Sequence, residues 1–259
     1  MRRQTVMRGY VIDMMGPERS GKTDAALTVS QNGKPTLLCA LDYNYEAPYK
    51  RHKKLGGRIE VIECFYSLPF ALPDSPKVKN FTKVINAIAD SVRPPLRKME
   101  ERLFSFIREH GKKPGSANVV MDNGTLLYRT VRLASFGYLH KVPMHLYAKS
   151  NNKMNHIINE LRFCGLNVVW VHRVNKEYDD ATDRPTGSFI RDGHKSIGPD
   201  VQATLLTIYD SDYTNKKTGK SGRFGVEVVD STFNPDTVGQ QFWRGRRKFS
   251  TITEVLTAE

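Results

Sequence analysis

One segment near the amino end of the chain combines the residue types that bind phosphate groups. Residues 16–23 read Gly-Pro-Glu-Arg-Ser-Gly-Lys-Thr and match the pattern GxxxxGK[ST] at every position. In such a loop the glycines let successive backbone N–H groups point at phosphate oxygens, Lys22 pairs with the β- and γ-phosphates, and Thr23 ligates Mg²⁺. A helix that begins at Lys22 would direct its positive end at the same phosphates. The predicted nucleotide-binding residues are therefore Gly16, Pro17, Glu18, Arg19, Ser20, Gly21, Lys22 and Thr23.

A carboxylate at the end of a later apolar run supports a magnesium site. Residues 119–121 read Val-Val-Met and are followed by Asp122. In phosphate-loop proteins an aspartate in this setting holds the Mg²⁺ shell, often through water. We therefore expect Thr23 and Asp122 to be the metal residues. Asn123 comes next, so the glutamate that many ATPases place directly after this aspartate is absent.

Hydrolysis also needs groups that orient the attacking water and sense the γ-phosphate. Asp42 and Glu46 follow the apolar run 36–41, whose end would lie beside the phosphate loop in a parallel sheet. We predict that Glu46 is the general base, with a solvated loop carboxylate as the alternative. His172 ends another apolar run and is predicted to sense the γ-phosphate, with a hydrogen-bonded histidine at a strand end as the alternative. Together with Lys22, these two residues make up the predicted catalytic set.

The base of the nucleotide is expected to be adenine, because the signals for guanine are incomplete. A GTPase carries Asn-Lys-x-Asp after a late strand, whereas residues 175–178 read Asn-Lys-Glu-Tyr. The Asp-x-x-Gly signal fails as well, since residues 122–125 read Asp-Asn-Gly-Thr. A second Gly-Lys-Ser, at residues 219–221, is interpreted as a basic hairpin turn, because the residue five positions before Gly219 is Thr214 rather than glycine. ATP is therefore the expected nucleotide.

Four short apolar runs and one alternating segment are separated by helical patterns, an arrangement typical of a parallel α/β sheet. The apolar runs are residues 10–15, 36–41, 117–121 and 167–171, and the alternating segment is residues 58–64. Apolar residues at helical spacing predict helices over residues 23–30, 81–92, 96–107 and 154–161. The sequence Arg93-Pro94-Pro95 is expected to break the chain between the second and third of these helices. The phosphate loop then lies between a strand and a helix, which is the position its function requires.

The later part of the chain has a different texture. Residues 175–199 are polar and rich in Gly, Pro and Asp, so they are predicted to form a long loop. Residues 203–209 and 224–229 have the composition of strands, and a Lys- and Gly-rich turn over residues 215–222 joins them. We therefore expect an antiparallel hairpin at the sheet edge near the carboxyl end.

Composition bounds the class of protein. The chain has 259 residues, of which 39% are hydrophobic and 26% charged, which excludes collagen, low-complexity and mostly disordered chains. No apolar run approaches the roughly 18 residues of a membrane helix. The run 10–15 is too short for a secretion signal and contains Asp13, so a cytoplasmic location is expected. The three cysteines, Cys39, Cys64 and Cys164, show no metal-binding spacing and are interpreted as buried thiols.

The charge balance points to an anionic partner. Lys and Arg number 40 against 27 Asp and Glu, a formal net charge of +13. Two basic runs include aromatic residues, Tyr49–Lys54 and Trp243–Phe249, and cations with stacking aromatics are typical of nucleic-acid binding. A solvated basic face is the alternative for each run. The predicted DNA-binding residues are Lys50, Arg51, Lys53, Lys54, Arg191, Lys195, Arg244, Arg246, Arg247 and Lys248.

The order of these motifs resembles the RecA-like P-loop ATPases over roughly residues 8–210. It is most similar to the phage-encoded RecA-like nucleotide-binding proteins, some of which are single-strand annealing recombinases. The resemblance rests on the phosphate loop, the strand end LDYNYE, the strand VVMD and the strand VVWVHR. The family's glutamate, shortly after the second strand, has no clean counterpart here. Asn44 occupies about that place, and Glu46 lies two residues further on.

This resemblance implies the fold and the partners. It implies a RecA-like core over residues 8–210. With the hairpin and basic carboxyl-terminal tail that the residues themselves predict over 211–259, we expect a single α/β domain over residues 1–259. It implies ATP and Mg²⁺ as cofactors and single-stranded DNA as partner, in recombination or strand annealing. It also implies a homo-oligomer, a ring or a filament, in the host cytoplasm if the chain is phage-encoded.

Two other functions stay open on the sequence. The missing glutamate is compatible with an ATP-binding assembly protein that hydrolyses slowly or not at all. A P-loop kinase that phosphorylates a small acceptor is the other alternative, with Arg184 and Arg191 as its basic lid.

Overall fold

The computed structural model describes residues 9–68, 81–137, 147–178, 182, 184–215, 219, 221–243 and 251–257. Within these residues nine strands form one sheet in the order β3-β2-β4-β5-β1-β7-β8-β9, and β6 pairs with β5 off this path. The strands are β1 (Val11–Gly16), β2 (Thr36–Ala40), β3 (Ile59–Glu63), β4 (Asn118–Asp122), β5 (Asn167–Tyr178), β6 (Pro185–Asp192), β7 (Ala203–Thr214), β8 (Ser221–Ser231) and β9 (Gln241–Trp243).

The centre of the sheet is parallel, as the four apolar runs and the alternating segment 58–64 predict. β3, β2, β4, β5, β1 and β7 pair with their neighbours in parallel, whereas β6, β8 and β9 pair antiparallel. Every residue of β1, β2 and β4 is buried. Strands buried on both faces need continuous apolar sequence, which explains why these runs do not alternate. The predicted α/β class, with a mostly parallel sheet flanked by helices, is confirmed.

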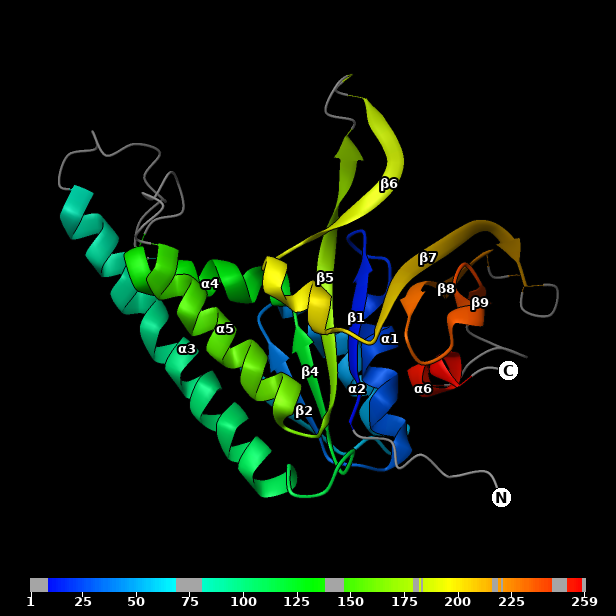
Figure 1. Ribbon diagram of the computed structural model, residues 1–259, viewed down its shortest axis with the longest axis horizontal. Helices are drawn as coiled ribbons and strands as arrows, with labels where there is room; N and C mark the ends of the chain where they lie inside the picture. Colours follow the sequence, from blue (N-terminus) through cyan, green and yellow to red (C-terminus); the bar gives the residue numbers. More distant parts are fainter. Residues whose placement is uncertain are drawn as a thin grey trace.

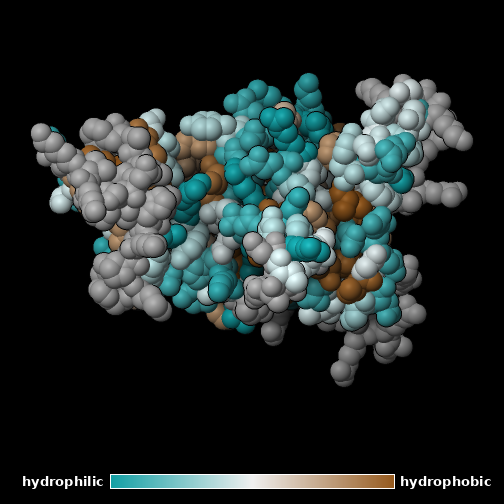
Figure 2. All heavy atoms as spheres, turned by 90° about the horizontal axis from the view of Figure 1, so that it is seen from above, coloured by the Kyte–Doolittle hydropathy of each residue, from teal (hydrophilic) through white to brown (hydrophobic). Residues whose placement is uncertain are grey.

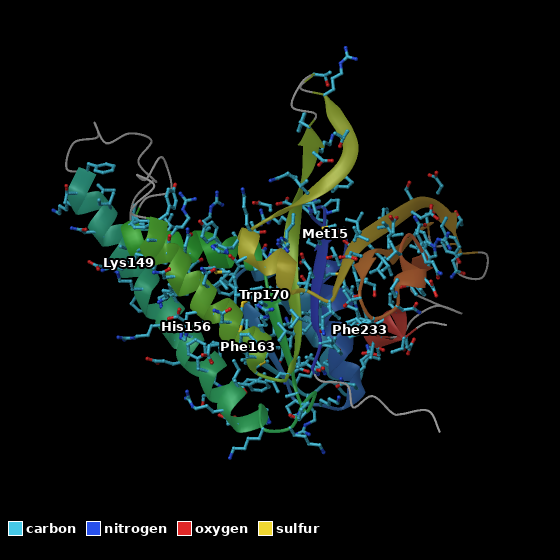
Figure 3. All side chains as sticks on the ribbon, viewed as in Figure 1. Met15, Lys149, His156, Phe163, Trp170 and Phe233 are labelled. Carbon is cyan, nitrogen blue, oxygen red and sulfur yellow. The ribbon has the colours of Figure 1, made fainter. Side chains whose placement is uncertain are left out.

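Helices cover both faces of the sheet (Figure 1). They are α1 (Lys22–Ala26), α2 (Glu46–Lys54), α3 (Phe81–His110), α4 (Gly124–Phe136), α5 (Tyr147–Phe163) and α6 (Ile252–Leu256), with short 3-10 turns η1 (Leu27–Asn32), η2 (Tyr43–Tyr45), η4 (Lys195–Asp200) and η5 (Pro235–Thr237). One core joins α3, α4 and α5 to the sheet around Trp170 of β5, which is labelled in Figure 3. The other core joins α1, η1 and α6 to the opposite face.

The helix over residues 81–110 corrects one prediction. The two helices expected on either side of Arg93-Pro94-Pro95 are a single helix, α3, with both prolines inside it. Its apolar stripe passes straight through this segment, because Val92 and Leu96 are both buried against the same core. Burying each large apolar side chain contributes about 1.5–3 kcal/mol, so the whole stripe outweighs the roughly 3 kcal/mol that an interior proline costs.

The segment 175–199 corrects a second prediction, because it is not a long loop. β5 continues to Tyr178, β6 returns antiparallel to it, and η4 follows. Gly and Pro residues gave the segment the composition of a loop, but pairing with the extended end of β5 supplies partners for its backbone. The resulting β5–β6 hairpin projects beyond the parallel part of the sheet (Figure 1).

The predicted carboxyl-terminal hairpin is confirmed and is longer than expected. β7 and β8 pair antiparallel from Ala203 to Ser231, and Gly219 lies in the turn between them, as the interpretation of the second Gly-Lys-Ser requires. The short strand β9, which the sequence does not predict, pairs with β8. The three cysteines are free and buried, as expected. Among the described residues, no helix is long and apolar enough to cross a membrane.

Candidate nucleotide-binding site

The phosphate loop lies between the end of β1 and the start of α1, at the carboxyl edge of the parallel strands. Gly16 has no room for a side chain, since a Cβ there would lie 2.0 Å from Thr207 Oγ1. Gly21 has φ 81°, a left-handed conformation that favours glycine, and precedes the first turn of α1. Ser20 Oγ donates to Pro17 O at 2.8 Å and lies 2.5 Å from Thr207 Oγ1, so β7 supports the loop from behind.

Lys22 reaches back over the loop. Its Nζ donates to Gly16 O at 2.8 Å and also to Pro17 O. Burial lowers the pKa of Lys22 to about 8, against the attraction of Asp122. A partly desolvated ammonium whose donors meet only carbonyl oxygens is poised to exchange these contacts for phosphate oxygens.

Thr23 and Asp122 meet as predicted for a magnesium site. Thr23 Oγ1 donates to Asp122 Oδ2 at 2.7 Å. β5 lies between β1 and β4, and all three are parallel, so their carboxyl ends face one site. Asp122 is buried, and burial raises its pKa to about 6, with a further rise from nearby Asp42 and an opposing effect of the bond from Thr23. A divalent cation would relieve this cost by compensating the buried carboxylate.

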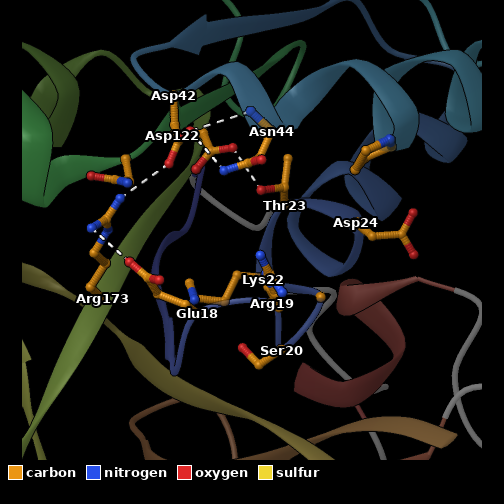
Figure 4. A pocket seen from close by; sticks show the side chains of 13 residues that line it. Glu18, Arg19, Ser20, Lys22, Thr23, Asp24, Asp42, Asn44, Asp122 and Arg173 are labelled. Carbon is orange, nitrogen blue, oxygen red and sulfur yellow. Dashed lines mark hydrogen bonds and ion pairs between the residues drawn. The ribbon is translucent and has the colours of Figure 1, made fainter.

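A pocket of about 350 Å³ opens beside these groups (Figure 4). Its lining contains both acidic and basic side chains. Its lining residues are Glu18, Arg19, Ser20, Gly21, Lys22, Thr23, Asp24, Asp42, Asn44, Pro48, Asp122, Asn123 and Arg173. Six of the eight predicted nucleotide-binding residues, from Glu18 to Thr23, therefore line one pocket together with Asp122.

Arg173 is a site residue that the sequence analysis missed. It lies at the pocket wall, where one guanidinium nitrogen is 2.8 Å from Glu18 Oε1 and the other is 3.3 Å from Asp42 Oδ2 (Figure 4). Side chains alternate between the two faces along a strand, so neighbours on β5 point to opposite sides. The signal was present in the strand end VVWVHR, where either the histidine or the arginine had to face the phosphate loop.

His172 is the residue that faces away. It is fully buried, its Nδ1 lies 2.5 Å from Asp13 Oδ1, and its ring stacks with Trp170 in the core under α5. A Cβ built on Gly124 would lie 2.2 Å from His172 Nε2, so the ring packs directly on the start of α4. Within the described part of the chain, Nε2 has no hydrogen-bond partner. His172 does not line the pocket. Because β5 continues to Tyr178, it lies inside the strand rather than at the strand end that the alternative assumed, and Asp13 contacts one of its ring nitrogens.

The two carboxylates that follow β2, Asp42 and Glu46, have different surroundings. Asp42 lines the pocket and accepts hydrogen bonds from the backbone N–H and the side-chain amide of Asn44, at 3.3 and 2.8 Å. Glu46 begins α2, is exposed, and forms an i,i+4 ion pair with Lys50 at 3.0 Å. Glu46 is not among the residues that line the pocket. Of the two, Asp42 is the carboxylate that lies at the pocket.

The first basic run forms α2, which packs beside α1. Arg51 lies 2.5 Å from Asp24 Oδ1, and His52 Nε2 lies 3.2 Å from the same oxygen, so Asp24 links the pocket wall to α2. Lys53 lies over the ring of Tyr49, and Lys54 is exposed. Three lysines of the run therefore face solvent, and Arg51 is committed to an internal ion pair.

The remaining predicted DNA-binding residues differ in their surroundings. Arg191 lies 3.0 Å from the buried carboxylate of Asp13 and is mostly buried, so it anchors β6 to β1. Lys195 is exposed at the start of η4. The four tail residues Arg244, Arg246, Arg247 and Lys248 lie outside the described residues.

No group of three or more His, Cys, Asp and Glu side chains in the described ranges is arranged to hold a metal ion by itself. A phosphate-loop magnesium site does not need such a group, because the ion takes a hydroxyl, one carboxylate, waters and the phosphates as ligands. Thr23 and Asp122 fit this requirement. No family model matches the chain, and no curated protein matches it.

Proposed function

We propose that this protein binds ATP with Mg²⁺ at the phosphate loop, hydrolyses it, and acts on single-stranded DNA as a RecA-like ATPase. The observation that carries the nucleotide site is the convergence of Lys22, Thr23, Asp122 and Arg173 on one pocket at the carboxyl edge of parallel strands. Sites at this edge are the usual ligand sites of open α/β sheets.

Each pocket residue has a distinct role in this proposal. The loop amides and Lys22 bind the phosphates, and Thr23 and Asp122 hold the Mg²⁺ ion, which neutralises charge on the β- and γ-phosphates when bound. Lys22 leaves its contacts with Gly16 O and Pro17 O when phosphate oxygens replace them. The loop is otherwise preformed, because Thr207 on β7 already supports it.

The chain has no clean counterpart of the family's glutamate, and Arg173 and Asp42 take over the catalytic roles that this leaves unfilled. Arg173 stabilises the negative charge that develops on the γ-phosphate, after leaving its ion pairs with Glu18 and Asp42. Asp42, once released from Arg173, orients the attacking water with the help of Asn44. Because Arg173 must exchange partners first, hydrolysis is expected to be slow without a second factor that favours the exchange.

Single-stranded DNA is proposed as that factor on the basis of charge and of exposed side chains. The chain has a net charge of +13, and α2 presents Lys50, Lys53 and Lys54 to solvent. Cations neutralise backbone phosphates and release counterions, which favours binding of any nucleic acid. Exposed aromatic side chains on the projecting hairpins add stacking surfaces that suit unpaired bases.

ATP hydrolysis with and without oligo(dT) tests the proposed function. Wild type should release phosphate faster with the oligonucleotide, and Lys22→Ala should release none in either condition. Arg173→Ala and Asp42→Asn should keep nucleotide binding but lose at least tenfold in turnover, whereas Glu46→Gln should match wild type. Equal turnover in wild type and Lys22→Ala would contradict the proposal.

One observation favours a slow or non-hydrolysing ATP-binding protein as the second candidate. The acids that line the pocket are all engaged: Asp122 with Thr23, Asp24 with Arg51 and His52, and Glu18 and Asp42 with Arg173. If ATP binds tightly and turnover stays negligible with DNA present, this second function replaces the first.

A further inference from the structure

The β5–β6 and β7–β8 hairpins extend beyond the parallel part of the sheet. Between them lies a groove, on the side of the phosphate loop away from the nucleotide pocket. β5 and β7 both run parallel to β1 and flank it, and both continue past its last residue, Gly16. The β5–β6 and β7–β8 hairpins therefore rise from the same edge, with the phosphate loop between them (Figure 1). A cavity of about 570 Å³ lies in this space. Its lining residues are Pro17, Glu18, Arg19, Ser20, Phe189, Leu206, Thr207, Ile208, Tyr209 and Phe224. We call it the hairpin groove.

The walls of the hairpin groove are apolar and aromatic. Phe189 comes from β6, whereas Tyr209 and Phe224 are paired across β7 and β8 with ring centroids 4.7 Å apart. These three side chains are 39%, 53% and 42% exposed. Seen from above, apolar atoms gather on the β7–β8 side of the molecule, next to a polar middle (Figure 2). Large aromatic rings left open on a surface mark a place where a partner binds.

The floor of the hairpin groove contains one acidic and one basic side chain, Glu18 and Arg19. Glu18 lies 2.8 Å from Arg173, and the ion pair of Asp210 with Arg223, at 2.9 Å, belongs to the opposite face of the β7–β8 hairpin. Arg19, also in the floor, is exposed, and no side chain in the described ranges forms an ion pair with it. The groove therefore combines stacking surfaces with an exposed arginine, and a partner that carries both phosphates and flat apolar faces suits it best.

The opposite face of the β7–β8 hairpin already shows the type of contact that such a partner would make. The guanidinium of Arg223 lies 4.0 Å from the ring centroid of Trp243 and 4.6 Å from that of Tyr213. Arginine planes and aromatic rings are the surfaces on which unpaired bases stack. A duplex hides its base faces inside its own stack, so a single strand fits these surfaces and a double strand does not.

We propose that the hairpin groove binds single-stranded DNA by stacking its bases on Phe189, Tyr209 and Phe224, with Arg19 at a backbone phosphate. This inference rests on the proposed function and names a DNA contact site other than the basic residues of α2. Since Pro17 to Ser20 form its floor, a strand in the groove touches the back of the loop whose front binds nucleotide. DNA and nucleotide must then change each other's affinity by the same factor.

The test compares two labelled oligonucleotides of equal length and charge, oligo(dT) and an abasic strand, by fluorescence anisotropy. Wild type should bind oligo(dT) at least tenfold more tightly. Tyr209→Ala and Phe189→Ala should each lower the affinity for oligo(dT) by threefold or more, toward the affinity for the abasic strand. The salt dependence of binding should stay unchanged. Arg19→Gln should weaken both strands equally. Tyr209→Phe, which keeps the ring, should match wild type.

Phe163→Ala is the matched control, because Phe163 is 75% exposed at the end of α5, far from both hairpins (Figure 3). Thermal unfolding of each variant shows that it is folded.

If Tyr209→Ala and Phe189→Ala bind oligo(dT) as wild type does, the groove is not the DNA site, although the proposed function stands. If these variants lose nucleotide affinity instead, the groove belongs to the nucleotide; if they change only the oligomer mass, a second copy of the chain occupies it. If wild type binds neither strand, the DNA part of the proposed function fails together with the groove.

Discussion

At the scale of single residues, the buried carboxylate of Asp122 makes the stability of the protein depend on pH. Burial raises its pKa from 3.8 to about 6, so between about pH 4 and 6 the folded protein holds a proton that the unfolded chain releases. The wild type therefore loses stability from this group as the pH rises through that interval. Asp122→Asn removes the charge and keeps an acceptor for Thr23. It should raise the free energy of unfolding at pH 8 by up to about 3 kcal/mol.

Urea unfolding of wild type and Asp122→Asn without Mg²⁺ at pH 4 and pH 8 measures this difference. The two proteins should be nearly equal at pH 4, where the wild-type carboxyl is protonated. His52, whose pKa burial lowers to about 4, titrates in both proteins and cancels in the comparison. A variant less stable than wild type at pH 8 would show that the protein compensates the carboxylate well without Mg²⁺.

Lys22 leads to a second pH dependence. Burial lowers its pKa to about 8 in the free protein, and phosphate groups would raise it again. Nucleotide binding above pH 8 must then take up a proton, so the affinity for a fluorescent ADP analogue should fall by up to about tenfold per pH unit. Lys22→Arg, whose guanidinium stays charged, should bind more weakly but without this alkaline limb. A flat wild-type profile from pH 7 to 10 would contradict the charge assigned to Lys22.

The sequence predicted the residues of the phosphate loop and Asp122, because backbone geometry and metal chemistry restrict which residue types function there. It did not choose between His172 and Arg173, or between Asp42 and Glu46. A one-residue shift along β5 decides whether His172 or Arg173 faces the pocket. The residue at which α2 begins decides whether Asp42 or Glu46 does so. Both depend on where an element begins or how it is rotated, which local composition does not determine.

At the scale of elements, the β5–β6 hairpin depends on one buried ion pair. Arg191 reaches from β6 to Asp13 in the middle of β1, where His172 already contacts the other oxygen. Arg191→Met should leave Asp13 undercompensated and cost roughly 3 kcal/mol in the free energy of unfolding, at the low end of the range for a broken buried pair because His172 remains. The double variant Asp13→Asn/Arg191→Met should recover most of this loss in urea unfolding. A loss under about 1 kcal/mol would show that strand pairing alone holds the hairpin.

The strands of the parallel sheet were predictable because burial on both faces requires apolar runs. The continuity of α3 and the pairing of β6 were not, since both are decided by long-range packing. Pro94 and Pro95 are strong local signals, yet the buried stripe of α3 overrides them. Pro185 and Gly187 likewise gave β6 the composition of a loop.

At the scale of the whole molecule, the charge of +13 implies DNA binding that depends strongly on salt. Neutralising Lys50, Lys53 and Lys54 together to Gln should reduce the slope of log affinity against log salt for oligo(dT) by up to about 2, from about 0.7 per phosphate contact. A triple Gln variant at Lys98, Lys112 and Lys113, all exposed and lying on α3 or just after it, has the same net charge and should leave the slope near wild type. Equal slopes in the two triple variants would show that α2 makes no phosphate contacts.

The central claim is that the pocket beside Lys22 and Asp122 binds a magnesium nucleotide. Calorimetric titration of a non-hydrolysable ATP analogue tests it most directly, in Mg²⁺ and in EDTA, with wild type, Lys22→Ala and Asp122→Asn. We predict one site per chain in wild type, at least tenfold weaker binding in Lys22→Ala, and loss of the Mg²⁺ effect in Asp122→Asn. Binding of equal strength in wild type and Lys22→Ala would contradict the account.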